Sequence, residues 1–306
     1  MAAMEVVWDQ ISERDWTRHA RAPLQQSWAY GAACAALGSK VLRAEVWSGG
    51  RRIALAQAVH RSFFGYLHAA VCTRGPIWVG DTTGEERRDA FRAITRSLPL
   101  PWTRGFFVTP DAPENEATHL RRARLRRVMT PYTTAVLDLA EPTDRLRAAL
   151  HQKWRNRLVA AEKAGLMITR ADRRPERYLW LLEQEAKQQR ARRYAALPPA
   201  LVPAWQQAGG DLRVLTATQG SETIAAMLFL IHGDRATYHI GWSSEAGKKS
   251  SANNLILWKA LGKLRKAGVR ELDLGGLNTQ DVPGIARFKL GTGAEVKTLC
   301  GTWFGR

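Results

Sequence analysis

The stretch LRAEVWSGGRRIALAQAV, residues 42–59, has a second version in LRVLTATQGSETIAAMLF, residues 212–229. Each copy begins with Leu-Arg, alternates like a strand, turns at a glycine and resumes with Ile-Ala before an apolar strand. Period-2 patterns on both sides of a glycine turn are typical of β-hairpins. The copies lie about one domain length apart. Either the chain contains a duplicated domain or two similar hairpins arose by chance, and helical segments in comparable places around both copies favour duplication.

The remaining patterns surround these hairpins with helices and further strands. The sequence predicts helices over 27–38, 84–98, 145–165, 175–194 and 252–268. It predicts strands over 133–139, 236–244, 270–277 and 297–304. In the helix expected at 145–165, apolar residues at steps of four form one stripe: Leu146, Leu150, Trp154 and Leu158. Helices opposite a mixed sheet indicate an α/β or α+β sandwich.

Length and charge bound the class of protein. At 306 residues the chain has room for two domains of ordinary size. Its net charge of +18 and pI near 10.5 are unusual for a globular protein. Such a charge is typical of proteins that meet nucleic acid, an anionic membrane surface or phosphorylated substrates. The alternative explanation is a GC-rich genome, which inflates arginine and alanine.

Several kinds of site are excluded by their missing motifs. The chain has no phosphate-binding GxxxxGK[ST], no dinucleotide-binding GxGxxG, no HExxH, no CxxC and no GxSxG. Because the histidines lack metal-ligand spacing, we expect no metal and no cofactor. The three cysteines lie far apart and are interpreted as free thiols. The stretch SSEAGKKSS, residues 243–251, either binds an anion at a helix N-terminus or forms a loop with an N-cap.

The cellular setting follows from the same patterns. The N-terminus lacks the charged and apolar regions of a signal peptide, and no stretch has the length of a membrane-spanning helix. We therefore expect a cytoplasmic monomer, with peripheral membrane contact through its basic surface.

The best-defined motif is GGLNTQDVPGIARFKLGTGAE, residues 275–295. Glycines let the backbone approach a ligand closely, or allow a bulge. Between the two glycine clusters lies Lys289, in a chain whose basic residues are mostly arginine. Its ammonium either stabilises a phosphate or a developing oxyanion, or forms a surface ion pair.

Several motifs together resemble the FemABX family of aminoacyl-tRNA-dependent aminoacyltransferases, which form peptidoglycan bridges. The motifs follow the family's order: QSWAYG (26–31), TRGP (73–76), MTPYTTAVLDL (129–139), KWRNRLVAAEKAG (153–165), and LDLGGLNT (272–279) followed by PGIARFKLGTGAE (283–295). The resemblance implies two tandem GNAT-like domains, each a mixed, mainly antiparallel sheet flanked by helices. We place the first domain at 1–145, completed by the C-terminal strand 298–306, and the second at 146–297.

The resemblance also implies a function and a set of site residues. The activity is transfer of an aminoacyl group from charged tRNA to an amine acceptor. Lys289 would stabilise negative charge at the ester or at a phosphate, and Phe288 would shape the site. The implied acceptor-binding residues are Arg190, Tyr194 and Tyr238. The basic face of the 145–165 helix either holds phosphates or is solvated, and we assign its candidate tRNA contacts as Lys153, Arg155 and Arg157.

Departures from the family pattern leave the acceptor open. The chain has no room for a coiled-coil arm between Ala186 and Asp211, so it resembles the compact FemX-like form. Thr109-Pro110 stands where FemX-like members have Asp-Pro, and the spacing gives Ala33 and Cys34 where the family has a lysine after the QSxxW helix. A peptidoglycan precursor, a peptide natural product and a lipid all remain as acceptors.

Two further functions compete with this interpretation. The first is a GNAT-type N-acyltransferase that uses acyl-CoA, for which a glycine-rich pyrophosphate loop is the expected sign. The second is a non-enzymatic scaffold that binds RNA or a membrane on an inactive transferase fold.

Overall fold

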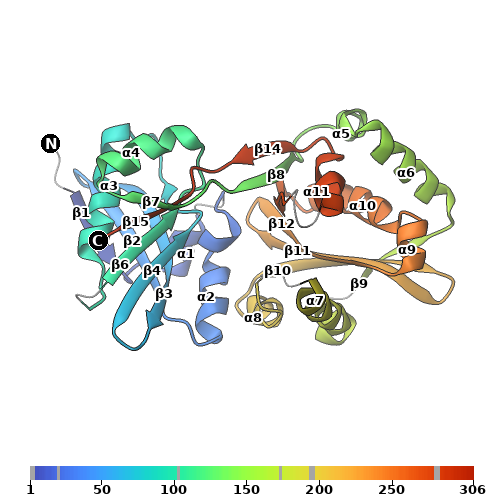
Figure 1. Ribbon diagram of the computed structural model, residues 1–306, viewed down its shortest axis with the longest axis horizontal. Helices are drawn as coiled ribbons and strands as arrows, with labels where there is room; N and C mark the ends of the chain where they lie inside the picture. The colour runs from blue at the N-terminus through green and yellow to red at the C-terminus, as the bar shows by residue number, and fades with distance from the viewer. Residues whose placement is uncertain (1–3, 19–20, 102–103, 172–173, 193–196, 279–282) are drawn as a thin grey trace. The chain divides into compact units, whose positions relative to one another are not determined.

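The computed structural model describes residues 4–18, 21–101, 104–171, 174–192, 197–278 and 283–306 (Figure 1). The chain divides into two compact units. Unit 1 comprises Met1–Thr133 and Thr298–Arg306, and unit 2 comprises Thr134–Lys297. Within the described ranges, every helix is too short or too polar to cross a membrane.

Unit 1 is built on a mixed sheet. Its strands follow the order β1-β2-β3-β4-β6-β15-β7, and β5 pairs with β3. The strands are β1 (Met4–Trp8), β2 (Val41–Ser48), β3 (Arg51–Phe63), β4 (Leu67–Thr73), β5 (Ile77–Trp78), β6 (Arg104–Thr109), β7 (Arg126–Met129) and β15 (Thr302–Gly305). β4 and β6 are parallel, whereas the other strand pairs are antiparallel.

Unit 2 repeats this arrangement. Its strands follow the order β9-β10-β11-β12-β13-β8-β14. They are β8 (Thr133–Asp138), β9 (Met167–Ala171), β10 (Asp211–Gln219), β11 (Glu222–His232), β12 (Arg235–Ser243), β13 (Glu271–Gly276) and β14 (Glu295–Thr298). The parallel pair is β12 with β13, in the same position in the order as β4 with β6 in unit 1.

The repeated sequence forms the β2–β3 hairpin in unit 1 and the β10–β11 hairpin in unit 2. Both hairpins turn at glycines with positive φ. Both also contain a register shift at the isoleucine of the Ile-Ala pair. The pairing skips Ile53 in the first hairpin and Ile224 in the second, and both side chains are buried. An irregularity at equivalent positions supports duplication more strongly than two regular hairpins would.

Two sequence-based assignments at the boundaries between units need correction. The strand predicted over 297–304 is two strands, because β14 joins the sheet of unit 2 and β15 joins that of unit 1. They are separated by Gly301, whose φ of 86° interrupts an extended strand. β8 pairs with β13 in unit 2. A boundary after residue 145 is therefore too late, because β8 already belongs to the second sheet.

The helices of unit 1 contribute to a core over one part of the sheet. They are α1 (Glu13–Thr17), α2 (Trp28–Ala36), α3 (Gly84–Ser97) and α4 (Ala117–Arg122), with 3₁₀ turns η1 (Leu24–Gln26) and η2 (Glu114–Glu116). Thr83 and Glu86 form a capping box that fixes the start of α3. α3 and α4 bury Phe91, Ile94 and Leu120 against strand residues that include Trp303.

The helix predicted over 145–165 is two helices, α5 (Thr143–Ala149) and α6 (Gln152–Lys163). Leu150 and His151 interrupt it with extended ψ angles of 130° and 143°. The apolar stripe nevertheless faces one core, because the four predicted residues are all buried there: Leu146, Leu150, Trp154 and Leu158.

The other helices of unit 2 complete two layers on its sheet. They are η3 (Pro175–Arg177), α7 (Leu179–Arg192), α8 (Leu201–Gln207), α9 (Glu245–Lys249), α10 (Ala252–Lys266) and α11 (Pro283–Leu290). α6 and α10 lie on one face of the sheet, and α7 and α8 lie on the opposite face (Figure 1). The main core of unit 2 lies under α5, α6 and α10.

Candidate functional site

The parallel strands β12 and β13 separate within unit 2. Their ladder covers only Arg235–Thr237 and Glu271–Asp273, although β12 runs on to Ser243 and β13 to Gly276. The carboxyl ends of parallel strands lie at the same edge of a sheet, and ligands bind at such openings in α/β proteins. Tyr238 is the first β12 residue beyond the ladder. It lies at the same edge of the sheet as the glycines at the end of β13.

Lys289 reaches this opening from α11. Its Nζ donates a hydrogen bond to the carbonyl oxygen of Gly276 at 2.9 Å, and the residue is only 8% exposed. The neighbouring Gly275 has a φ of +77°, and a Cβ there would lie 3.5 Å from Nζ. Glycine therefore suits the left-handed backbone at this position, while a Cβ there would be in ordinary van der Waals contact with the ammonium group.

Asp273 lies beside the lysine on β13. Its carboxylate accepts hydrogen bonds from the Thr134 hydroxyl at 2.6 Å and from the backbone N–H of Gly275 at 2.7 Å. Burial lowers the pKa of Lys289 to about 8, against a smaller opposing effect of the Asp273 charge. Because this pKa lies near neutrality, Lys289 is mostly protonated at pH 7 and holds a proton that it can exchange.

Phe288 packs α11, the helix that carries Lys289, against α6. Its ring packs against Trp154 of α6, with centroids 5.9 Å apart, and its carbonyl accepts a hydrogen bond from the Trp154 indole at 3.1 Å. A Cβ on Gly291 would lie 2.7 Å from Trp154 Cδ1. A Cβ on Gly293 would lie 2.5 Å from the carbonyl oxygen of Ala149. These glycines after the Phe-Lys pair therefore allow α11 to pack against the junction of α5 and α6.

Tyr238 packs against Phe229, with ring centroids 5.8 Å apart. Its hydroxyl lies over Gly241, where a Cβ would be only 1.8 Å away. Burial, with a smaller effect of the Glu185 charge, raises the pKa of Tyr238 above its usual value, so the phenol stays protonated. The register shift between β11 and β12 skips His239, and burial lowers the pKa of this imidazole to about 4. Sequence reasoning missed His239, because a bulge leaves no signal in hydrophobic alternation.

Of the other expected site residues, Arg190 belongs to α7 and the three basic residues belong to α6. Arg190 is exposed on α7, and Tyr194 lies outside the described residues. Lys153 and Arg157 are exposed on α6. Arg155 differs from them, because its guanidinium donates to the last carbonyl groups of the α5 segment, those of Ala148 at 2.7 Å and Leu150 at 3.1 Å.

The serine-rich stretch forms α9 and ends at Ser251, the N-cap residue of α10. Ser244 caps α9 by accepting a hydrogen bond from the N–H of Gly247. Ser251, with a φ of 55°, separates the two helices. In the first turn of α10, Asn254 is 5% exposed, and its Nδ2 has no hydrogen-bond partner among the described residues. An unpaired buried donor in the first turn of a helix is suited to an anion.

In unit 1 two of the sequence motifs meet. The buried Gln26 amide donates to the carbonyl oxygens of Gln57 at 2.9 Å and Thr73 at 2.8 Å, and accepts from the N–H of Gln57. A Cβ on Gly75 would lie 2.5 Å from the Gln26 side chain. Arg74 has a φ of 57° and binds the Asp111 carboxylate. The glutamine of QSWAYG therefore fixes the strand end that carries TRGP.

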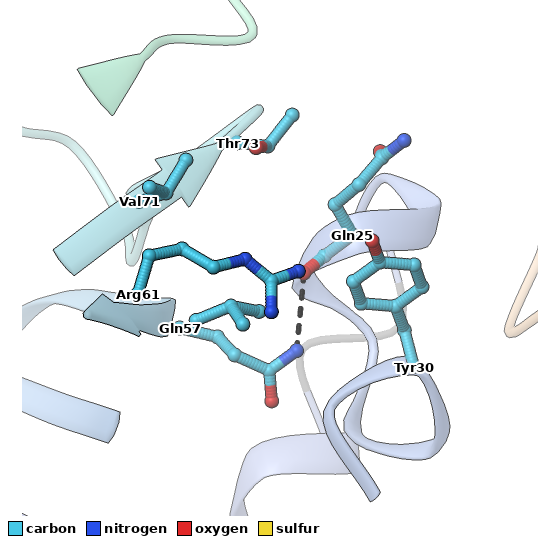
Figure 2. A pocket seen from close by; sticks show the side chains of 7 residues that line it. Gln25, Tyr30, Gln57, Arg61, Val71 and Thr73 are labelled. Carbon is cyan, nitrogen blue, oxygen red and sulfur yellow. Dashed lines mark hydrogen bonds between the residues drawn. The ribbon is translucent and has the colours of Figure 1, made fainter. Parts of the chain in front are cut away.

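A cavity of about 80 Å³ lies beside this network, lined by Gln25, Tyr30, Gln57, Val59, Arg61, Val71 and Thr73. Figure 2 shows the Arg61 guanidinium and the Tyr30 ring around it, with the Gln57 amide bonded to the Gln25 carbonyl. Burial raises the pKa of Tyr30, with a smaller contribution from Cys34. The cavity combines a cation with a neutral phenol and is large enough for a small polar group.

The described residues contain no candidate metal site. Among the described residues, His, Cys, Asp and Glu form no group of three or more that fits a metal ion.

Comparisons with known proteins agree on the fold. Residues 145–290 match the family described as Acetyltransferase (GNAT) domain. A search of curated proteins gave no match. A crystal structure of FemX is 13% identical, with 97% of this chain and 96% of that chain covered and a TM-score of 0.80.

Two other solved structures have the same organisation. A tandem GNAT protein from the clavulanic acid biosynthesis pathway is 14% identical, with 99% of this chain and 98% of that chain covered and a TM-score of 0.57. The C-terminal domain of a putative lysylphosphatidylglycerol synthetase from Agrobacterium fabrum is 13% identical, with coverages of 96% and 91% and a TM-score of 0.57. The chain therefore has a FemX-like fold of two tandem GNAT-like domains, each a mixed, mainly antiparallel sheet flanked by helices, and the match to the GNAT domain family lies within its second unit.

Proposed function

We propose that this protein is an aminoacyltransferase that moves an amino acid from charged tRNA to an amine of an acceptor, forming an amide bond. The observation that carries the proposal is the buried Lys289 ammonium at the Gly276 carbonyl, where β12 and β13 separate. The FemX-like fold and the GNAT domain match support it. A cytoplasmic monomer fits this proposal, because charged tRNA is present in the cytoplasm.

The reaction requires little covalent chemistry from the protein. The neutral acceptor amine attacks the carbonyl carbon of the aminoacyl ester, and a C–N bond forms. The C–O bond to the terminal ribose breaks, and the proton lost by the amine ends on the ribose oxygen. Because the ester is already activated, catalysis consists mainly of positioning the two reactants and stabilising the charge that develops.

Lys289 is the proposed electrostatic and proton-transfer group. In its protonated form it stabilises negative charge on the carbonyl oxygen or the leaving ribose oxygen. Its pKa of about 8 allows it to give a proton to that oxygen and regain it from the amine. Phe288 holds α11 against Trp154 and so fixes the position of the lysine. Arg190, Tyr194 and Tyr238 are the proposed acceptor-binding residues.

The charge of the chain supports a polyanionic donor. A net charge of +18 favours RNA binding that weakens as salt is added. Lys153 and Arg157 of α6 are exposed and are the proposed phosphate contacts, together with Arg155. Peptidoglycan precursors, peptide natural products and lipids are the proposed acceptor classes. The Arg61 cavity of unit 1 is an additional candidate for holding a polar group of the acceptor.

An acyl-CoA-dependent N-acyltransferase is the second candidate. The unpaired Asn254 Nδ2 at the start of α10 favours an anion there, and a pyrophosphate fits as well as an RNA phosphate. The loop before it, however, lacks the glycine-rich pattern typical of CoA users.

The donor is tested by label transfer. The purified protein is incubated with a mixture of radiolabelled aminoacyl-tRNAs or with radiolabelled acyl-CoAs, in the presence of muropeptide, lipid and small-amine acceptors. The proposal predicts RNase-sensitive transfer to an acceptor from tRNA. Transfer from acyl-CoA alone would overturn it in favour of the second candidate, and absence of transfer from both donors would favour a scaffold.

The role of Lys289 is tested in the same assay. Lys289→Ala is expected to lower turnover by about 10²- to 10³-fold, because removing one stabilising group from an active site has this effect. Lys297→Ala, which removes a partly exposed lysine of the same unit, is the matched control and should keep parental activity. If Lys289→Ala stayed within a few-fold of the parent while folded, Lys289 would have no part in the mechanism.

A further inference from the structure

The β3–β4 hairpin of unit 1 ends in an exposed apolar loop. β2 pairs with β3 only as far as Val59, whereas the pairing with β4 continues to Phe63 and Leu67. The hairpin therefore extends beyond β2, and its course can be followed in Figure 1. Four apolar side chains at its end, named here the aromatic tip, are strongly exposed: Phe63 by 52%, Phe64 by 87%, Tyr66 by 60% and Leu67 by 44%.

The backbone of the aromatic tip is unusual for its sequence. Phe64 has a φ of +54°, a left-handed conformation that is uncommon for a bulky residue and that asparagine or glycine adopts more easily. The ring meets only Tyr66 among the aromatic contacts described, at 6.3 Å between centroids. The turn thus keeps an aromatic residue where both backbone preference and exposure favour a polar one. This combination points to a function for the ring.

Positive charge gathers behind the aromatic tip. Residues 46–80 contain no Asp or Glu. The His60 and His68 rings stack, with centroids 5.2 Å apart. Burial, with smaller effects of His68, Lys40 and Arg61, lowers the pKa of His60, so the positive charge here comes from Lys40 and Arg61. Arg61 lies three residues before Phe64, so at a strand rise of about 3.3 Å per residue it is roughly 10 Å behind the end of the hairpin.

We propose that the aromatic tip docks this protein on the surface of an anionic lipid bilayer. Interfacial anchors insert apolar and aromatic side chains about 5–10 Å into the boundary of the acyl chains, while basic residues meet anionic headgroups. The arrangement of the hairpin fits this depth, with apolar residues foremost and Lys40 and Arg61 behind. Single-stranded RNA binders instead mix aromatic and basic residues on one surface, and residues 62–67 contain no basic residue. Apart from Arg61, which also lines the cavity of unit 1, the residues of this surface have no part in the proposed transfer reaction.

Vesicle co-sedimentation tests the proposal on the full chain. The vesicles contain phosphatidylcholine and phosphatidylglycerol in equal parts, or phosphatidylcholine alone. The parent protein should bind the anionic vesicles, and binding should weaken as salt is added. The double variant Phe64→Asn, Tyr66→Ser should bind them at least about tenfold more weakly, with an unchanged melting temperature because asparagine accepts the left-handed turn.

Three further variants separate anchoring from general effects. Phe64→Trp should keep vesicle binding, because an aromatic ring remains. Met167→Ser, which removes a 60% exposed apolar residue of unit 2, should bind like the parent. Lys40→Glu should weaken binding to the anionic vesicles only.

Other outcomes would overturn the proposal. They are equal vesicle binding by the parent and the double variant, no vesicle binding by the parent, loss of tRNA binding in place of vesicle binding, or conversion of a dimer to a monomer by the double variant. The first two remove the bilayer as the partner. The last two would assign the aromatic tip to RNA or to a second copy of the chain.

Discussion

The ammonium group of Lys289 lies in an environment that disfavours its charged form. The residue is buried, its Nζ is bonded to one carbonyl oxygen, and Asp273 supplies the opposing negative charge. Ordinary lysines have pKa values near 10.4 and do not exchange protons readily at pH 7. A pKa of about 8 therefore gives Lys289 a property that a surface lysine lacks.

This pKa predicts the pH dependence of the reaction. Because the protonated form is the one that stabilises negative charge, turnover should fall as pH rises through about 8, by about tenfold for each further unit. The measurement is single-turnover rate against pH, with the acceptor amine saturating.

Two variants identify the group responsible. Lys289→Arg should be slower but lose the alkaline decline, because a guanidinium remains protonated. Asp273→Asn removes a charge that raises the pKa of Lys289, so the decline should move to lower pH. A decline at the parental pH in both variants would assign it to another group.

The sequence could predict which residue to examine but not its environment. The scarcity of lysine and the glycines around it leave the role of Lys289 open, and the resemblance to the FemABX family implies a place for it in the site. The hydrogen bond to Gly276 and the carboxylate of Asp273 depend on how α11 folds back against β13, and no local pattern determines this. His239 lies in a bulge and Arg155 bonds to nearby carbonyl groups, and residue type predicts neither arrangement.

The end of α11 and the α5–α6 junction form one packed element of unit 2. His151 donates its backbone N–H to the Gly291 carbonyl at 2.9 Å, and Gly293 approaches Ala149. The extended step at Leu150 and His151 creates this junction. Helical periodicity predicts one uninterrupted helix there, because the apolar stripe continues across the break. The interruption is a tertiary effect.

Glycine substitutions test the packing of this element. Gly293→Ala should lower the free energy of unfolding by more than about 1 kcal/mol, because it combines a φ of +77° with a Cβ 2.5 Å from a carbonyl oxygen. Gly284→Ala, in α11 with no atom within 4 Å of the added Cβ, should be neutral or slightly stabilising. Urea unfolding measures both. Equal effects would show that contact with the α5–α6 junction does not determine the requirement for glycine.

Substitutions of the basic residues of α6 should have different effects, although all three lie on one helix. Lys153→Ala and Arg157→Ala should each weaken tRNA binding and reduce the slope of log affinity against log salt by about one, with stability unchanged. Arg155→Ala should weaken tRNA binding and also lower the melting temperature, because its guanidinium bonds to the carbonyls of Ala148 and Leu150. Binding titrations over a salt series and thermal unfolding distinguish the two. Identical salt slopes in all variants would exclude α6 from the RNA contact.

At the scale of the whole molecule, the chain crosses between its two sheets. β8 follows β7 but joins the other sheet, and β15 follows β14 and joins the first. The hairpin repeat in the sequence predicts two similar domains. The repeat by itself does not predict these exchanges, because β7, β8, β14 and β15 are short and their partners lie far away in sequence. The family resemblance places the C-terminal strand 298–306 in the first domain, but nothing places β8 in the second.

Substitution of Trp303 tests how far the stability of unit 1 depends on its C-terminal strand. This side chain is 1% exposed in the core of unit 1, so Trp303→Ala should destabilise that unit by about 3–5 kcal/mol. Hydrogen exchange should accelerate in β6 and β7, which pair with β15, and stay at the parental rate in β10–β13. Trp47→Ala, at a partly exposed tryptophan of β2, should have a smaller effect. Uniform acceleration in both units would contradict an independent unit 1.

The position of β15 also affects folding during synthesis. Domains generally fold from the N-terminus as the ribosome extends the chain. Here β6 and β7 remain without the strand that joins them until residues 302–305 have been translated, after all of unit 2. Until then the nascent chain exposes two strand edges, which are templates for incorrect pairing. The unit that begins first is thus completed last, and a chaperone bound to the nascent chain has most to protect in the N-terminal half.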